Sequence, residues 1–294
     1  MGYNKLVLNG STLIDLTSDT VSSDVLLQGY KAHNKAGSLV TGNIPLKNQD
    51  SIIKDDINGT ITIPMGYYQE DVVIQVEVAP PEPEIPTDSI MHESVGTVIY
   101  IGSDAYRIVH QGLPESDIYD ESCSGTWVWK EVLLPETAAF NSSNYVNTDV
   151  YAYLTSWFSG LSESIKSHVK TVKIPYCSGS TVQVGANGLS TKVFSLSGRE
   201  LGWVASSLPD DGYCLDYFVG MANSDPARKK KPPGGSYESH STRTYVPGNR
   251  RQLGILGSSG GPSQAALNLE RYVAPAFILD EFVRINNDKE AIFE

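Results

Sequence analysis

The chain of 294 residues is long enough for two or three domains, and its 40% hydrophobic and 19% charged residues are typical of a folded protein. A formal net charge of −12 argues against nucleic-acid binding, which needs clustered positive charge to meet the phosphates. The sequence contains no run of about 18 apolar residues, so no membrane span is predicted. Its first residues lack the apolar core of a signal peptide, and we expect synthesis in a cytoplasm without ordinary secretion.

Small β modules are predicted for the first 78 residues, in two parts, 1–45 and 46–78. Lys5–Asn9 and Thr12–Leu16 flank the dipeptide Asn9-Gly10, which suits the positive φ angles of a type I′ hairpin turn. Ser22 can begin a short helix that ends at Gly29. Modules of this size have little core of their own, so we expect them to pair with copies of themselves or with another protein.

The rest of this region alternates turns and strands. Asn34–Gly37 is predicted as a turn and Ser38–Ile44 as a strand. A further strand at Thr60–Ile63 is followed by a turn at Pro64–Gly66. Asp71–Val78 then places every second residue on one apolar face, as in a half-buried strand.

Two segments of this region resemble a module found near the N-terminus of tail and tail-fibre proteins of bacteriophages that infect Gram-positive bacteria. The resemblance covers about Leu13–Val78. It rests on GYKAHNKAGSLVTGNIP and IPMGYY, through Gly29, Ala32, His33, Asn34, Gly37, Val40, Thr41, Gly42, Ile44, Pro45, Ile63, Pro64, Gly66, Tyr67 and Tyr68. It implies a virion protein, with other virion proteins as partners and a homotrimer as the expected assembly.

A proline-rich linker is predicted at residues 79–88. The segment APPEPEIP (79–86) has four prolines in eight residues, which favours an extended polyproline II spacer. The fold class expected for the whole chain is mainly β with some α (α+β), with a larger domain at 89–294.

The larger domain begins with a predicted hairpin, Gly96–Ile101 and Tyr106–His110, and a buried strand within Thr126–Leu134. Two amphipathic helices follow. The first is capped at Asn147 or Thr148 and ends near Phe158, and the second covers Ser162–Val169.

The segment Val169–Trp203 is predicted to form the scaffold at the centre of this domain. It reads as a strand at Val169–Tyr176, a loop, a strand at Lys192–Leu196, and a short helix begun by a capping box of Ser197 and Glu200.

After this scaffold, a short helix is expected within Asp211–Val219. Residues 220–262 have almost no apolar periodicity and are expected to form a long irregular segment that is functional or disordered. A strand at Arg271–Leu279 closes the domain.

Residues of about Val95–Asp280 resemble a domain of unassigned function that recurs in phage structural proteins and Gram-positive surface proteins. The resemblance rests on the ordered motifs YRIVHQGLP, YDESCSGTWVWKE, FNSSNY, VYAYLTSWF, IKSHVKTVKIPY, GANGLSTKVFSLSGRELGW and VAPAFILD. It implies a fold related to the C-type lectin and formylglycine-generating-enzyme group. Relatives carry W-W-L-R-S-P where this chain has HSTRTYVP at His240–Pro247, so the aromatic side chains of that motif are missing.

Catalytic and metal sites find little support. His110 with Asp117 or Asp120 could serve in acid–base chemistry, but His110 ends a β run. Asp210, Asp211 and Asp216, or the pair Asp117 and Asp120, could bind Ca²⁺, although neither set has EF-hand spacing. We therefore predict no enzyme activity, no metal and no cofactor, with a cell-wall polymer hydrolase as an alternative.

The sequence does not decide the state of the three cysteines or the role of the basic run. Cys123, Cys177 and Cys214 allow one disulfide, whose pair the sequence cannot choose, or three ordinary thiols. The run Arg228–Lys231 is either a phosphate-binding patch or a solvated loop.

The irregular segment is the predicted ligand site, because it combines aromatic rings with guanidinium donors that suit host-surface glycans and acidic polymers. An assembly surface and a solvated loop are the alternatives. The function predicted is a virion protein of tail, baseplate or fibre type for host recognition, with a purely structural decoration protein of head or tail as an alternative. The candidate ligand-binding residues are Tyr237, His240, Arg243, Tyr245, Asn249, Arg250 and Arg251.

Overall fold

The computed structural model describes residues 3–47, 53–55, 60–68 and 84–293. The chain divides into two units, Met1–Glu82 and Pro83–Glu294, and the division falls within the predicted linker. Strands account for 35% of the residues and helices for 16%, which confirms a mainly β protein with some α-helix. The predicted strand at 71–78 and the first part of the linker, residues 79–83, lie outside the described residues.

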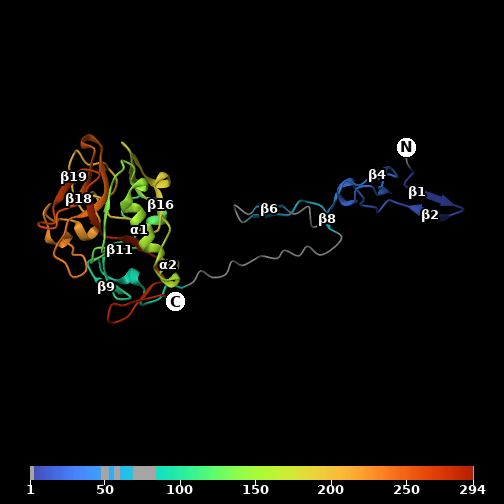
Figure 1. The fold of residues 1–294 in the computed structure, drawn as a ribbon. Helices are drawn as coiled ribbons and strands as arrows, with labels where there is room; N and C mark the ends of the chain where they lie inside the picture. The colour runs from blue at the N-terminus through green and yellow to red at the C-terminus, as the bar shows by residue number, and fades with distance from the viewer. Residues whose placement is uncertain (1–2, 48–52, 56–59, 69–83, 294) are drawn as a thin grey trace. The chain divides into compact units, whose positions relative to one another are not determined.

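The first unit consists of short β ribbons (Figure 1). Strand β1 (Lys5–Leu8) pairs antiparallel with β2 (Ser11–Asp15) across a turn in which Asn9 and Gly10 have φ angles of 49° and 77°, as the type I′ prediction requires. The other pairs are β3 (Lys31–His33) with β4 (Leu39–Thr41), β6 (Ile53–Asp55) with β7 (Thr60–Thr62), and β5 (Leu46–Lys47) parallel to β8 (Tyr67–Tyr68).

Local side chains and glycines set the turns of this unit. The Asn34 side-chain oxygen accepts hydrogen bonds from the backbone N–H of Ala36 and Ser38, both at 3.0 Å, which confirms the predicted turn. The helix expected after Ser22 is a single 3-10 turn, Ser23–Val25. A Cβ at Gly42 would lie 2.1 Å from the carbonyl oxygen of Leu27, so only glycine fits there.

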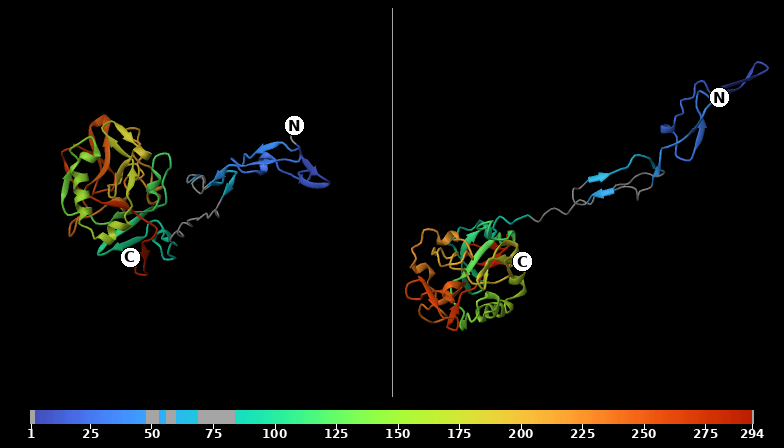
Figure 2. Two further views of the ribbon diagram at one scale, coloured as in Figure 1. Left: turned by 90° about the vertical axis from the view of Figure 1, so that its right-hand side faces the viewer. Right: turned by 90° about the horizontal axis from the view of Figure 1, so that it is seen from above.

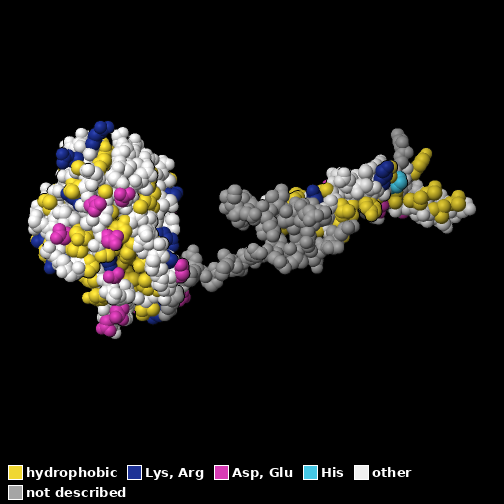
Figure 3. Space-filling view, in the orientation of Figure 1, with side chains coloured by type: hydrophobic (Ala, Val, Ile, Leu, Met, Phe, Trp, Pro, Cys, Tyr) yellow, Lys and Arg dark blue, Asp and Glu magenta, His cyan; other side chains and the backbone are white. Residues whose placement is uncertain are grey.

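No hydrophobic side chain in the described part of the first unit is buried. Figure 3 shows hydrophobic side chains on the surface of this unit. They lie on both strands of the first hairpin and recur along the described chain as far as Met65 and Tyr67. The most exposed are Tyr3, Leu8, Leu13, Val25, Tyr30, Leu39 and Met65.

The second unit is built on a four-stranded antiparallel sheet, in the order β21-β11-β10-β9. Its strands are β9 (Val98–Ile101), β10 (Asp104–Gln111), β11 (Thr126–Lys130) and β21 (Ala276–Leu279). The predicted hairpin at 96–110 and the buried strand at 126 are thereby confirmed. An ion pair between Asp88 and Arg284, at 2.9 Å, holds the first residues of this unit against its C-terminal segment.

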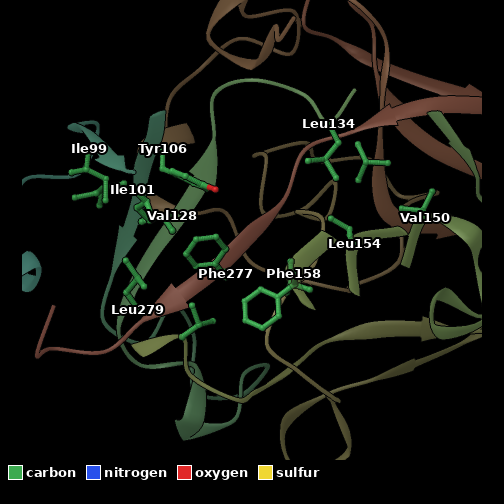
Figure 4. Close-up of a cluster of buried hydrophobic side chains, with 14 of the residues drawn as sticks. Ile99, Ile101, Tyr106, Val128, Leu134, Val150, Leu154, Phe158, Phe277 and Leu279 are labelled. Carbon is green, nitrogen blue, oxygen red and sulfur yellow. The ribbon is translucent and has the colours of Figure 1, made fainter. Parts of the chain in front are cut away.

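This sheet separates two hydrophobic cores. Val128 and Phe277 point into the first core, which Figure 4 shows, whereas Trp127, Trp129 and Ile278 point into the second. The alternation follows from the two-residue repeat of a strand, and it is why every residue of β11 is buried.

Helices α1 (Asp149–Ser159) and α2 (Glu163–His168) match their predictions closely. The Thr148 hydroxyl accepts from the backbone N–H of Tyr151 at 3.1 Å and caps α1. Val150, Leu154 and Phe158 recur at the helical spacing and bury their side chains in the first core.

The second sheet is five-stranded, in the order β12-β20-β17-β18-β19. Only the pair β17–β20 is parallel, and in Figures 1 and 2 strands β18 and β19 lie on the opposite side of the domain from the two helices. Its members are β12 (Thr137–Ala139), β17 (His240–Val246), β18 (Arg251–Ile255), β19 (Pro262–Ala265) and β20 (Glu270–Val273).

Two predictions are wrong here. Residues 220–262, expected to be irregular, supply β17 and β18 and the start of β19. The strand expected at Arg271–Leu279 is two strands, β20 and β21, which belong to different sheets and are separated by Ala274 and Pro275.

Small hairpins complete the domain. The central scaffold contains two of them, but its segment Lys192–Leu196, predicted as a strand, forms none, and only Phe194 bridges to Ala276. The helices expected at Ser197 and within 211–219 are a single turn and a 3-10 turn at Asp216–Phe218. The hairpins are β13 (Val172–Ile174) with β16 (Leu189–Thr191), β14 (Tyr176–Ser178) with β15 (Thr181–Gln183), and β22 (Arg284–Ile285) with β23 (Ala291–Ile292). Within the described ranges, no helix has both the length and the apolarity to cross a bilayer.

Candidate functional site

The structure does not gather the seven predicted ligand residues into one site. Strand β17 buries three of them, His240, Arg243 and Tyr245. Three others, Asn249, Arg250 and Arg251, are exposed at the turn from β17 to β18, and Tyr237 is exposed on a separate loop.

His240, Arg243 and Tyr245 are therefore corrected from surface ligands to core residues. His240 packs against Trp129, with 6.1 Å between ring centres. Burial lowers the pKa of His240 to about 3, so its imidazole is neutral. Tyr245 packs in the first core. None of the three side chains is accessible to a glycan on the surface.

Arg243 is the centre of a buried polar network. Both of its terminal nitrogens donate to the carboxylate of Glu200 at 2.5 Å, a bidentate pair with both side chains fully buried. The remaining guanidinium N–H groups donate to the backbone oxygens of Pro175, Ser195 and Asp211 at 2.8, 3.0 and 2.9 Å. All five donors of the guanidinium group are thereby used.

The sequence analysis identified Glu200 only as part of a capping box with Ser197. The structure contains the two hydrogen bonds of that capping box. The backbone N–H of Ser197 donates to the Glu200 carboxylate at 2.8 Å, and the Ser197 hydroxyl accepts from the N–H of Glu200 at 3.1 Å. The carboxylate also accepts from the Tyr119 hydroxyl at 2.7 Å. Glu200 therefore joins the capped turn to strand β17 through Arg243, which capping alone does not predict.

Asp211 adds a second buried carboxyl group to this network. Its Oδ2 accepts from the Thr244 hydroxyl at 2.7 Å, but its Oδ1 has no hydrogen-bond partner. Burial raises the pKa of Asp211 to about 6, against the opposing effects of the Arg243 charge and the Thr244 hydroxyl.

Asp211→Asn should therefore stabilise the protein at pH 7.5 but not at pH 4. The folded-state pKa lies above the ordinary aspartate pKa of 3.8, so the wild type loses stability as the pH rises through about 6. At about 1.4 kcal/mol per pKa unit, the loss is at most about 3 kcal/mol. Urea unfolding at both pH values measures it. Asp210→Asn is the control, because that side chain is 83% exposed. A variant less stable than wild type at pH 7.5 would contradict this account.

The basic run Arg228–Lys231 is not a solvated loop, because every second side chain is buried. The guanidinium of Arg228 lies 5.7 Å and 5.6 Å from the ring centres of Trp203 and Phe218 and donates to the backbone oxygens of Leu201 and Ala222. The Lys230 ammonium lies 3.5 Å from the ring centre of Trp129.

Lys230 also lies 3.5 Å from the Glu131 carboxylate. Burial lowers the pKa of Lys230 to about 8, despite the attraction of Glu131.

The two other lysines of the run lie on a single aromatic ring. The ammonium groups of Lys229 and Lys231 lie 4.3 Å and 4.5 Å from the ring centre of Tyr237, which is 47% exposed. Tyr237 is the one predicted ligand residue that is both exposed and aromatic. The lysines beside it were not among the predicted ligand residues, and four consecutive cations show no two-residue pattern that would indicate which of them are buried.

Of the turn residues Asn249, Arg250 and Arg251, Asn249 contacts a residue that lines a cleft, Gln264. Asn249 donates from its side-chain amide to Gln264 at 2.8 Å, and Arg250 adopts a left-handed φ of 52°. The cleft has a volume of about 190 Å³, and its lining mixes polar residues with Trp203, Val204, Leu208 and Leu253.

A second cleft, of about 280 Å³, lies where the linker meets the domain. It is lined by Ile85, Met91, Gln111, Lys170 and Glu281 among others. Gln111 donates to the backbone oxygens of Ile90 and Glu93, and Lys170 donates to that of Ser124. These hydrogen bonds hold the two polar side chains against the wall of the cleft.

The acid–base and calcium candidates are dispersed. His110 faces Asp216 at 2.9 Å, not Asp117 or Asp120. Asp210 pairs with Arg199, and Asp120 accepts from the backbone N–H of Ser122. Across the described residues, no three His, Cys, Asp or Glu side chains are grouped as metal ligands.

The three cysteines are free thiols. Cys123 and Cys177 are buried, and burial raises the pKa of each to about 12. The disulfide left open by the sequence is not formed.

The fold and the side-chain clusters define a mainly β domain with two large sheets and two cores, preceded by a separate unit of β ribbons. The family model described as Domain of unknown function (DUF6273) matches residues 125–281, which is more than half of the chain, and the chain belongs to this family. No curated protein and no solved structure matches the sequence.

Proposed function

We propose that the chain is a virion structural protein of tail, baseplate or fibre type that displays a host-recognition domain. Its N-terminal unit joins copies of the chain into a homotrimer and attaches them to other virion proteins. Its C-terminal domain, related in fold to the C-type lectin and formylglycine-generating-enzyme group, contacts a host-surface glycan without catalysing a reaction.

The observation that carries this proposal is the contrast between the two units. The second unit has two buried cores, whereas the described first unit buries no hydrophobic side chain. On the first hairpin, Leu6, Leu8 and Leu13 are 49%, 59% and 56% exposed. Apolar ribbons exposed to this degree gain stability when copies cover one another's side chains. The resemblance to phage tail modules supports the same assignment.

The full chain should sediment as a trimer of the 32.0 kDa subunit, and Leu6→Ser/Leu8→Ser/Leu13→Ser should reduce it to a monomer because the apolar contacts between copies are lost. Analytical ultracentrifugation measures both. Val204→Ser/Val219→Ser/Leu269→Ser is the matched control, because these apolar side chains are exposed on the second unit. A wild-type chain that is monomeric at micromolar concentration would overturn the assembly role.

Recognition requires its own test. The full chain should bind a subset of immobilised bacterial surface glycans, and virions labelled on this domain should carry the label at the host-facing end. Attachment to virions without binding to any glycan or host cell would instead indicate a decoration protein. Release of soluble sugar from cell walls would indicate a hydrolase.

A further inference from the structure

Two lysines of the basic run, half-buried Lys229 and exposed Lys231, are held in place by their buried neighbours. Arg228, the last residue of the 3-10 turn Pro226–Arg228, is buried against the rings of Trp203 and Phe218. Lys230 is buried against the ring of Trp129, whereas Lys229 and Lys231 contact the Tyr237 ring. Lys230 bridges to Glu238, and a turn with a hydrogen bond from the N–H of Gly235 to the carbonyl of Pro232 closes the loop. The bridge between Lys230 and Glu238 therefore brings the ammonium groups of Lys229 and Lys231 close to the ring of Tyr237, the residue before Glu238.

The loop carrying Tyr237 is also fixed from behind. A Cβ at Gly257 would lie 2.5 Å from the backbone carbon of Glu238 and 2.7 Å from the carbonyl oxygen of Tyr237. A Cβ at Gly260 would lie 3.3 Å from the Lys229 side chain. The glycine-containing loop after β18 thus packs directly against the backbone of Tyr237 and the aliphatic part of the Lys229 side chain.

These two ammonium groups lack a counter-ion among the described residues. Neither forms an ion pair with a carboxylate in the described part of the chain, whereas other lysines of this acidic protein do, including Lys5, Lys130, Lys166, Lys173, Lys230 and Lys289. Two like charges near one ring repel each other, and the ring offsets only about 0.5–1 kcal/mol for each exposed cation. An anion bound between them would relieve this repulsion.

We propose that Lys229, Lys231 and Tyr237 form a binding site for a phosphate group carried by a surface polymer. Two ammonium groups are compact point charges that can each donate to a different oxygen of a tetrahedral phosphate, whereas a planar carboxylate is matched best by a guanidinium fork. The inference rests on the proposed recognition function and specifies its ligand as a phosphodiester-bearing polymer. Tyr237 is a positioning residue, because both ammonium groups lie within 4.5 Å of its ring centre.

The test measures binding of the full chain to poly(glycerol phosphate), inorganic phosphate and polyglutamate by isothermal titration calorimetry at low salt. Lys229→Gln/Lys231→Gln should weaken binding of poly(glycerol phosphate) at least about tenfold. Lys166→Gln/Lys173→Gln removes the same net charge from existing ion pairs and should change it less than about twofold. Tyr237→Phe keeps the ring and should bind as wild type, whereas Tyr237→Ala should bind about as weakly as the lysine variant.

Comparing the two polymers distinguishes recognition of the phosphate group from attraction to negative charge alone. Polyglutamate should bind about tenfold more weakly than poly(glycerol phosphate), and free phosphate should compete only at much higher concentration because it makes one contact at a time. Equal binding of polyglutamate, or undiminished binding by Lys229→Gln/Lys231→Gln, would overturn the phosphate site. If that variant still bound host cells through another glycan, the recognition function would stand without the phosphate site. Unchanged melting temperatures would exclude unfolding as the cause of a loss.

Discussion

Arg243→Met should destabilise the second unit by about 3–5 kcal/mol, a loss comparable to the whole stability of some domains. The substitution keeps most of the side-chain volume but removes all five donors. It leaves the Glu200 carboxylate buried without its cation and three backbone carbonyl groups without a partner. Buried charges left unpaired in this way cost more than the pair itself contributes.

The measurement is urea unfolding followed by tryptophan fluorescence. All four tryptophans, Trp127, Trp129, Trp157 and Trp203, lie in the second unit, so the signal reports that unit alone. Arg251→Met is the matched control and should change stability by less than about 0.5 kcal/mol, because Arg251 is exposed.

A double variant separates the pair from its surroundings. Arg243→Met/Glu200→Gln removes both charges, so it should be less destabilised than the sum of the two single variants. A loss below about 1 kcal/mol for Arg243→Met would show that the carboxylates do not depend on Arg243, and the network would not be a determinant of the fold.

The elements that could be predicted from the sequence are those fixed by neighbouring residues. The Asn9-Gly10 turn needs positive φ angles, which these two residues adopt at little cost, and the structure has them. Helix α1 combines a Thr148 cap with apolar residues at helical spacing. Both signals act within a few residues of the chain, where the sequence displays them directly.

Strand β17 could not be found in this way, because its burial is made possible by distant partners. HSTRTYV is mostly polar, yet every one of its residues is buried. Arg243 is paired with a residue 43 positions away, and the Thr242 hydroxyl donates to the backbone oxygen of Leu253. Polar residues without apolar periodicity normally predict a surface loop, and here tertiary hydrogen bonds override that pattern.

The burial of Arg228 and Lys230 in the basic run could not be predicted for a similar reason, since it too depends on distant residues. Four consecutive cations normally indicate a solvated segment, but the rings that accept Arg228 and Lys230 come from Trp203, Phe218 and Trp129. By contrast, the division between β20 and β21 did have a local signal. Pro275 lies inside the apolar run, and a proline lacks the N–H group that a central strand needs.

Trp127→Ala should also destabilise the second unit by about 3–5 kcal/mol, the cost of removing a large aromatic side chain from a packed core. Trp127 is fully buried on the central strand β11. Its ring centre lies 5.5 Å from those of both Tyr119 and Phe194, and its indole N–H donates to the backbone oxygen of Cys123 at 3.0 Å. The variant loses these ring contacts and leaves a cavity.

Trp127→Phe distinguishes the cavity from the hydrogen bond. Phenylalanine retains an aromatic ring but lacks the indole N–H, so it should cost about 1–2 kcal/mol, between wild type and alanine. The three remaining tryptophans report unfolding in urea for both variants. Because Val128, the next residue of β11, packs in the opposite core, both cores should unfold in one transition. Two separate transitions in Trp127→Ala would show that the cores on either side of the sheet are stable independently of each other.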